Sequence, residues 1–303
     1  MPYCLLGSLP HTYRPMGPHA AAVLSQAPQA DLPHILIPSK NRHHCLERTC
    51  RLAIATGARV TVCDQSSQAW TGMDGVEVLH CPNVPSLPAA RNVLLRHADA
   101  SLLIFIDDDT DLAADFAHQV WHLARCETEM SAWGPVIESR SRWTRRCVRM
   151  GHWGVMRDPR RLTVGSSDRP TRALFGCCFA VRRSMALAVG GFDCSRRGYS
   201  LGEDLDFFLR AQARGYRSRF SRRLRARHRE ERSGRYDPYA RGAAKARWWL
   251  WLARRHGRSN PCTVLHVAWA LVGGMSGIGR EPGSLRGIMH GLRTPNADRL
   301  IGG

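Results

Sequence analysis

The sequence has few acidic residues for its length. Its 303 residues hold 25 aspartates and glutamates against 44 lysines and arginines, which gives a formal net charge of +19. This charge predicts attraction to an acidic partner, whether a nucleic acid, an anionic membrane surface or a phosphorylated small molecule. Composition alone does not choose among them. Hydrophobic residues make up 44% of the chain, which is enough to fill a core and indicates a globular protein.

The sequence also lacks closely spaced cysteine pairs. Its 11 cysteines include no CxxC motif, which argues against a zinc ribbon. Cys177 and Cys178 are adjacent, which disfavours an ordinary disulfide between them. Scattered reduced cysteines are typical of the cytosol. We therefore expect a cytoplasmic protein, with the inner face of the cell membrane as an alternative location.

Neither end of the chain shows a clear targeting or spanning pattern. Residues 1–32 contain no basic segment followed by an apolar run, and we expect them to form a poorly ordered tail. The apolar segment after Pro261 has about the length of a membrane-spanning helix. His266 and several glycines interrupt it, so we expect packed or interfacial helices in a C-terminal extension over residues 233–303. A true span is the alternative.

Short apolar segments alternate with amphipathic ones from Pro33 onward. Strands are predicted over residues 34–37, 59–64, 76–81 and 101–106, with a helix ending at Gly57 and another over residues 88–98. This alternation predicts an α/β fold with a mostly parallel central sheet flanked by helices. Ligands of such sheets bind at the carboxyl ends of the strands.

The second half of the chain is less regular. Its Arg-rich part, residues 138–172, shows no clear pattern. A strand over 172–181, interrupted at Gly176, and a helix over 200–215 are predicted next. In the following segment, 216–228, apolar residues and arginines alternate, which predicts a strand with one side exposed to solvent. That strand would bring His228 to the inner side.

Three aspartates, Asp107 to Asp109, follow directly on the strand predicted over residues 101–106. Carboxylates at the end of a buried strand repel one another and resist losing water. A divalent cation would relieve this conflict, because Mg²⁺ and Mn²⁺ prefer oxygen ligands. The alternative is a solvated loop with a helix-capping aspartate.

Four separated stretches resemble family 2 glycosyltransferases with the GT-A fold. They are IPSKNR…VCDQSS, LPAARN…LLIFIDDD, GCCFAVRRS…VGGFD and GEDLDFFLRAQARG, and RARH follows the last. Their order and spacing are more specific than any one of them. The resemblance implies a Rossmann-like GT-A domain over residues 33–232. Its nucleotide-binding half would be 33–111 and its acceptor-side half 112–232.

The resemblance also implies which residues bind the nucleotide-sugar donor, for which we favour a UDP-sugar. Asp64 would meet the nucleotide base, and Asp107 would lie near the ribose or the sugar. Arg91 would neutralise the diphosphate. Asp108 would either join these residues or turn into the strand end. Gly176 would let the backbone approach the donor or the acceptor closely.

The remaining implied roles concern the metal and the proton transfer. Asp109 and His228 would hold Mn²⁺ or Mg²⁺, which acts as a Lewis acid on the departing diphosphate. Asp204 would take the proton of the acceptor hydroxyl, and Glu203 would orient the acceptor. One base opposite one leaving group implies inversion at the anomeric carbon. A simpler interpretation of Glu203 and Asp204 is a favourable interaction with a helix dipole.

Two other classes of protein remain open. The net charge is compatible with a nucleic-acid-binding protein, although no known binding motif occurs and the arginine runs alternate with apolar residues. A nucleotidylyltransferase can share the fold, but such enzymes carry a glycine-rich loop after the first strand, and IPSKNRHH has no glycine. The acceptor is not identified; a lipid-linked or anionic acceptor at a membrane, a polysaccharide, a peptide and a small natural product all remain candidates.

Overall fold

The computed structural model describes residues 28, 31–139, 170–196, 200–231, 233, 237–257, 264, 268 and 284–297. Three of the segments discussed above fall largely or wholly outside these residues. They are the expected tail over residues 1–32, most of the Arg-rich part and most of the apolar segment after Pro261.

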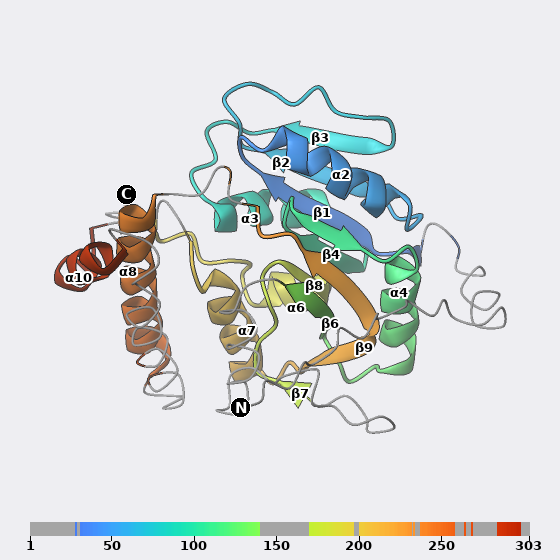
Figure 1. The fold of residues 1–303 in the computed structure, drawn as a ribbon. Coiled ribbons are helices and arrows are strands. Elements are labelled where there is room, and N and C mark those ends of the chain that lie inside the picture. Colours follow the sequence, from blue (N-terminus) through green and yellow to red (C-terminus); the bar gives the residue numbers. More distant parts are fainter. Residues whose placement is uncertain are drawn as a thin grey trace, which may run out of the picture.

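One nine-stranded mixed sheet forms the centre of the molecule (Figure 1). Its strand order is β3-β2-β1-β4-β8-β6-β9-β5, and β7 pairs with β9. The strands are β1 (His34–Ser39), β2 (Val60–Asp64), β3 (Val76–His80), β4 (Leu102–Ile106), β5 (Thr110–Leu112), β6 (Ala132–Ser139), β7 (Pro170–Thr171), β8 (Cys178–Arg182) and β9 (Ser218–His228).

The expectation of a mostly parallel sheet holds for only half of it. Strands β3, β2, β1 and β4 are parallel to one another. Strand β8 runs antiparallel to both β4 and β6, and β5 and β7 run antiparallel to β9, whereas β6 and β9 are parallel. The sheet is therefore mixed: β5, β7 and β8 run opposite to the other six strands.

Helices cover both faces of this sheet (Figure 1). They are α2 (His43–Ile54), α3 (Leu87–His97), α4 (Phe116–Cys126), α6 (Arg183–Ala188), α7 (Glu203–Ala213), α8 (Pro238–His256) and α10 (Ser284–Arg293). Strand residues alternate between two core clusters. Leu36 and Phe105 pack with α3, α6, α7 and α8, whereas Ile35 and Ile104 pack with α2 and α4. We call these the α7 face and the α4 face of the sheet.

Local sequence explains where the helices near the site begin. Ser86 caps helix α3, because its hydroxyl accepts a hydrogen bond from the Ala89 amide, and Pro88 lies in the first turn of the helix. Helix α7 follows Gly202, which has a φ of +101° that favours glycine. The first turn of α7 carries Glu203 and Asp204, which the helix dipole stabilises.

The strand expected over residues 172–181 begins later than predicted. Strand β8 starts at Cys178, and the residues before it form a loop. In this loop the Gly176 amide donates to Asp204 and the Gly176 carbonyl accepts from Arg91. The N–H and C=O groups of Gly176 are both hydrogen-bonded to side chains. They are therefore not available for hydrogen bonds to a neighbouring strand.

Strand β9 changes face at a bulge. Along β6 and β9, Pro135 pairs with Ser221, but the next residue of β6, Val136, pairs with Arg225. Before the bulge Phe220 packs in the cluster of the α7 face. After it, Leu224 packs in the cluster of the α4 face. The alternation predicted for this strand is thus present, but it shifts by one position at the bulge.

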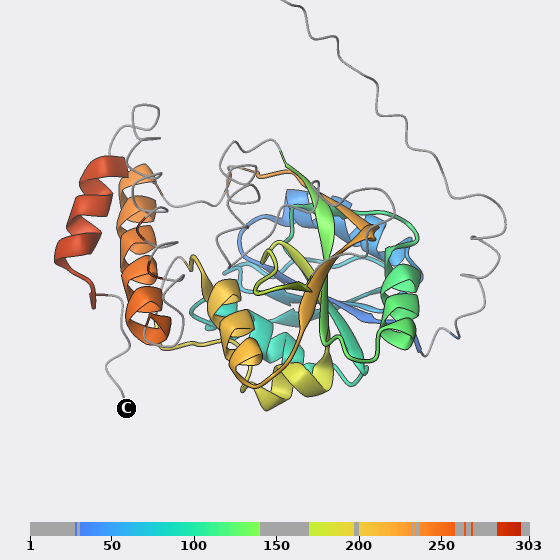
Figure 2. The ribbon, with the colours of Figure 1, turned by 90° about the horizontal axis from the view of Figure 1, so that it is seen from below.

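The C-terminal helices α8 and α10 lie side by side at one end of the molecule, next to α7 (Figure 2). Asp237 caps α8 by accepting from the Tyr239 and Ala240 amides. Trp249 and Leu252 of α8 belong to the core cluster of the α7 face. No helix within the described parts of the chain is long and apolar enough to cross a membrane.

Helix α8 approaches the start of α7 very closely. A Cβ atom at Gly202 would lie 2.6 Å from Leu252 Cδ1, so the end of the Leu252 side chain would have to move. The positive φ at position 202 favours glycine, and the close packing of Leu252 adds to this preference.

Candidate active site

Three potential metal ligands meet at the ends of β4 and β9. Asp107 and Asp109 follow β4, and His228 ends β9. Their ligand atoms all lie within 4.8 Å of one another, and His228 Nε2 is 3.0 Å from Asp109 Oδ1. Two carboxylates and an imidazole suit Mn²⁺, and the carboxylates also suit Mg²⁺. The donor set thus fits the cation that we expected from the sequence.

The electrostatics of this group keep Asp109 ionised. Burial alone would raise the pKa of Asp109, but its hydrogen bond to His228 and the charges of His228 and Arg42 lower it well below its usual range. Burial would likewise lower the pKa of His228, but Asp109 raises it above the ordinary value. The Asp109 side chain is therefore an anionic carboxylate, which is the form that binds a cation.

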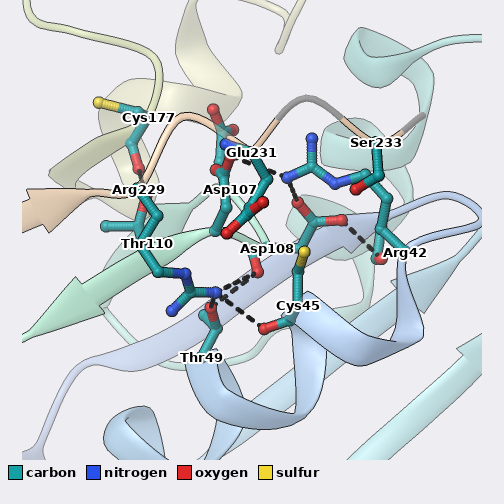
Figure 3. Close-up of polar contacts among 12 residues, drawn as sticks. Arg42, Cys45, Thr49, Asp107, Asp108, Thr110, Cys177, Arg229, Glu231 and Ser233 are labelled. Carbon is teal, nitrogen blue, oxygen red and sulfur yellow. Dashed lines mark hydrogen bonds and ion pairs between the residues drawn. The ribbon is translucent and has the colours of Figure 1, made fainter. Parts of the chain in front are cut away.

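Arg42 neutralises two of the aspartates (Figure 3). Its Nη2 contacts Asp108 Oδ1 and lies 2.9 Å from Asp109 Oδ2. Asp108 also accepts a 2.8 Å hydrogen bond from the Ser39 hydroxyl. Burial raises the pKa of Asp108 to about 7, although Arg42 opposes this shift. The Asp108 side chain is thus bonded to residues at the end of β1 and the start of α2, apart from the three metal-ligand candidates.

The buried guanidinium group of Arg91 forms hydrogen bonds with several segments of the site. Its Nη1 donates to Glu203 Oε1 at 2.9 Å. Its Nη2 donates to Asp107 Oδ1 at 3.1 Å and to the Gly176 carbonyl at 2.8 Å. Arg91 is only 1% exposed. Its charge is therefore committed to Glu203 and Asp107, and it links α3 to α7, β4 and the loop before β8.

Asp204 lies beside this cluster, half-buried at the start of α7. Its Oδ2 accepts a 2.7 Å hydrogen bond from the Gly176 amide, and its Oδ1 accepts one of 2.8 Å from the Leu205 amide. A Cβ atom at Gly176 would lie 2.9 Å from Asp204 Oδ2, so the close approach depends on glycine. Burial raises the pKa of Asp204. The sequence suggested a close approach of Gly176 to a ligand; the structure shows one to Asp204.

Glu203 lies deeper than its neighbour. It is buried and bonded to Arg91, and burial together with the charge of Asp204 raises its pKa to about 7. The two adjacent carboxylates therefore have different surroundings: Glu203 faces Arg91 inside the protein, and Asp204 is partly exposed.

Asp64 lies at the end of β2, on the same edge of the sheet as Asp107. Its carboxylate accepts hydrogen bonds from the Ser66 amide at 3.0 Å and the Trp70 amide at 2.7 Å. Burial would raise the pKa of Asp64, but these hydrogen bonds lower it. Asp64 therefore orders the loop that follows β2.

Arg42 and Arg229 also lie at the site, although no role was expected for either from the sequence. Arg229 Nη2 donates to the Cys45 carbonyl at 2.9 Å and to Thr49 Oγ1 at 3.1 Å, and the Arg229 amide donates to the Asp109 carbonyl (Figure 3). It thus fixes the end of β9 to α2. Arg42 is the last residue of the motif IPSKNR, and Arg229 directly follows RARH. Their positions in or beside these motifs were the one indication in the sequence that they belong to the site.

The fold places this site in a known class of structures. No protein-family model and no curated protein sequence matches the chain. The crystal structure of GalNAc-T7 with UDP, GalNAc and Mn²⁺ is similar, with a TM-score of 0.54 and 15% identity; the match covers 76% of this chain and 52% of that one. The chain thus spans about half the length of GalNAc-T7.

A second solved structure matches over nearly the whole chain. It is the mannosyltransferase PcManGT from Pyrobaculum calidifontis in complex with GDP-Man and Mn²⁺, with a TM-score of 0.54 and 16% identity. The match covers 94% of this chain and 82% of that one. At these identities the likeness concerns the fold, and it confirms the expected fold class: the chain has the α/β fold of GT-A glycosyltransferases.

Proposed function

We propose that the protein is a metal-dependent, inverting glycosyltransferase that moves a sugar from a nucleotide-diphosphate donor, a UDP-sugar, to an acceptor hydroxyl. The observation that carries the proposal is the meeting of Asp107, Asp109 and His228 at the strand ends, with Asp204 on a neighbouring helix. The two similar structures hold Mn²⁺ together with UDP or GDP-Man, which supports a divalent cation and a nucleotide-sugar here.

The donor side of the reaction follows from the charges at the strand ends. Breaking the bond to the anomeric carbon leaves a nucleoside diphosphate, whose negative charge must be neutralised. Asp109 and His228, joined by Asp107, would hold Mn²⁺ or Mg²⁺, which supplies this neutralisation as a Lewis acid. The loop ordered by Asp64 would receive the nucleotide base.

The acceptor side depends on Asp204. A hydroxyl that attacks the anomeric carbon must lose its proton, and a carboxylate within hydrogen-bond reach takes it. The amides of Gly176 and Leu205 fix the orientation of the Asp204 carboxylate. Burial raises its pKa, which makes it a stronger base than a solvated aspartate. A single displacement with this one base inverts the anomeric configuration.

Three residues support this arrangement without contacting the reacting atoms. Arg91 acts through Asp107 and Gly176, to which it donates hydrogen bonds. Glu203 holds Arg91 rather than the acceptor, because its carboxylate is buried and bonded to the guanidinium. Asp108 holds Arg42 in place next to Asp109. We therefore propose that all three are positioning residues.

Thermal shift measurements with UDP, GDP and their sugars, with and without Mn²⁺, test the proposal. A nucleoside diphosphate at 100 times its dissociation constant stabilises a protein by about 2.7 kcal/mol, which raises the melting temperature by several degrees. We expect this shift only with Mn²⁺. Asp109→Asn should abolish it, whereas Asp74→Asn, a change at an exposed aspartate, should not. A protein that no nucleoside diphosphate stabilises with Mn²⁺ would contradict the proposal.

A further inference from the structure

The exposed apolar side chains of the described chain gather on its C-terminal part. Five large hydrophobic residues are exposed, and four of them follow residue 237: Tyr239, Val264, Leu285 and Met289. The fifth, Leu187, lies on α6. Single exposed apolar residues are ordinary on a protein surface, whereas a group of them indicates a binding surface.

The packing of α10 on α8 fixes which side of α10 faces outward. Helix α10 lies on the side of α8 away from the sheet (Figure 1 and Figure 2). A Cβ atom at Gly287 would overlap the Tyr239 carbonyl, and one at Gly291 would overlap the Ala243 carbonyl. Ile288 is only 1% exposed. The two glycines thus bring the backbones of the helices into close contact, and the opposite side of α10 is open.

The open side of α10 carries two stripes that run along the helix next to each other. Leu285 and Met289, four residues apart, form an apolar stripe. Arg286, His290 and Arg293, at spacings of four and three, form a basic stripe. All five side chains are exposed. Because consecutive residues are about 100° apart around a helix, the basic stripe lies directly beside the apolar one.

Helix α8 extends this surface. The ring of Tyr239 lies 5.7 Å from the ring of His290, measured between centroids. Helix α8 contains five arginine and lysine residues and α10 contains two, and neither helix contains an aspartate or a glutamate. The helix pair therefore combines exposed apolar groups with positive charge.

We propose that the outer side of α10 docks on an anionic lipid membrane. Leu285 and Met289 enter the headgroup region, and Arg286 and Arg293 bind lipid phosphate groups. A helix that lies in the plane of a membrane surface has this pairing of an apolar and a basic side. Tyrosine is typical of the same boundary, because its ring is apolar and its hydroxyl is polar. The inference goes beyond the proposed glycosyl transfer and does not depend on it.

A lipid surface fits α10 better than other acidic partners do. A nucleic acid uses the positive charge but leaves the apolar stripe exposed. A stable protein partner covers about 800 Å² of each surface. A helix of ten residues is about 15 Å long, and its two stripes present much less area than that.

Co-sedimentation of the full chain with lipid vesicles tests the proposal. Vesicles of phosphatidylcholine with about 30 mol% phosphatidylglycerol are compared with vesicles of phosphatidylcholine alone. We expect at least tenfold tighter binding to the anionic vesicles. Raising the salt from about 50 to about 200 mM should weaken this binding, because salt screens the attraction. Amide hydrogen exchange over residues 284–293 should slow when anionic vesicles are added.

Two double variants separate the stripes. L285Q/M289Q removes the apolar side chains, and R286Q/R293Q removes the charge. We expect each variant to bind the anionic vesicles at least tenfold more weakly, since both contributions are needed. R286K/R293K should keep most of the binding, because the charge is kept. The melting temperatures should be unchanged, since these positions are exposed.

Matched controls lie elsewhere on the surface. L187Q changes an exposed leucine of α6, and R96Q/R214Q removes the same charge from exposed arginines of α3 and the end of α7. We expect both controls to bind the vesicles like the unchanged protein.

Several results would overturn the inference. They include no binding to anionic vesicles, equal losses in R286Q/R293Q and R96Q/R214Q, and full binding by L285Q/M289Q. If L285Q/M289Q lowers the melting temperature by several degrees, the chain itself covers the apolar stripe. If it converts a dimer to a monomer in light scattering, a second copy covers the stripe. Either result would also contradict docking on lipid, whereas the UDP and Mn²⁺ thermal shift tests the glycosyltransferase proposal separately.

Discussion

His256 Nε2 of α8 lies 2.8 Å from Asp206 Oδ1 of α7, and this contact joins the C-terminal helix to the helix that carries Asp204. Asp206 is fully buried. Arg210 Nε donates to its other oxygen at 2.8 Å, and Arg255 Nε of α8 lies 3.1 Å from Oδ1. Because Asp206 is in the first turn of α7, α8 helps to hold Asp204 at its position.

His256→Leu tests this link. Asp206 keeps Arg210 and Arg255, so we expect a loss of about 1–3 kcal/mol in unfolding free energy, the cost of one lost partner in a buried network. A small displacement of Asp204 should lower kcat at least tenfold with little change in donor affinity. His290→Leu, at an exposed position of α10, is the control. A variant that loses stability but keeps kcat would limit His256 to a structural role.

Asp204→Asn should remove the base while leaving the donor site intact. We expect kcat to fall by about 10²–10⁴, the usual contribution of a general base. The Mn²⁺-dependent thermal shift with the donor should persist, and Asp74→Asn should behave like the unchanged protein. Proton NMR of the product made by the unchanged protein shows the anomeric configuration. Near-normal turnover by the Asn variant, or a retained configuration, would contradict the assignment.

The pH profile should report the raised pKa of the base. Asp204 must be ionised to accept a proton, so activity should be full above its pKa and lost as the pH falls through it. Because burial raises that pKa, we expect the acid limb of kcat above the ordinary aspartate value of about 3.9. The limb belongs to the Glu203–Asp204 pair, since the two groups interact.

Glu203→Gln gives the matching comparison. The pKa of Glu203 is raised to about 7, in part by the charge of Asp204, so Glu203 is already neutral at the lower pH at which Asp204 takes up its proton. Glutamine resembles this neutral form, and we therefore expect the acid limb to stay near its place. Profiles of kcat against pH for both proteins, at saturating donor and Mn²⁺, measure the difference. An acid limb that moves to clearly lower pH would show instead that Glu203 is ionised beside the base and raises its pKa.

Arg91→Met should destabilise the fold strongly. The change leaves Glu203 and Asp107 without their buried partner, and breaking such a pair costs about 3–5 kcal/mol. Arg96→Met, at an exposed position of the same helix, should cost well under 1 kcal/mol. Urea unfolding of both variants gives the two free energies. Equal values would mean that the ion pairs of Arg91 contribute little.

The sequence predicted the first half of the fold well. Strands β1, β2 and β4 and helix α3 follow directly from local patterns, because each buries a continuous or periodic apolar segment, and β3 was predicted although it is only partly buried. The ends of β4 and β9 were also predictable as neighbours of the site. Asp109 and His228 are 119 residues apart in number, but the resemblance had already placed both at a metal.

The second half depended on contacts that no local pattern encodes. Strand β8 starts late because the backbone of Gly176 is bound by Arg91 and Asp204, residues distant in sequence. The face change of β9 arises from its register with β6. The position of Arg42 beside Asp109 is likewise a tertiary contact. Such contacts become visible only when the chain is folded.

The glycine before α7 has a consequence for any shortened form of the protein. Residues 31–233 contain every candidate metal ligand and the candidate base Asp204. However, two residues of α8 complete the core on this side: Leu252 packs against Gly202, and Trp249 is buried in the same cluster. A chain cut after residue 233 would lack α8 and would expose to water the apolar surface that Trp249 and Leu252 cover next to α7. We expect such a fragment to aggregate, so the smallest soluble unit has to extend at least to the end of α8.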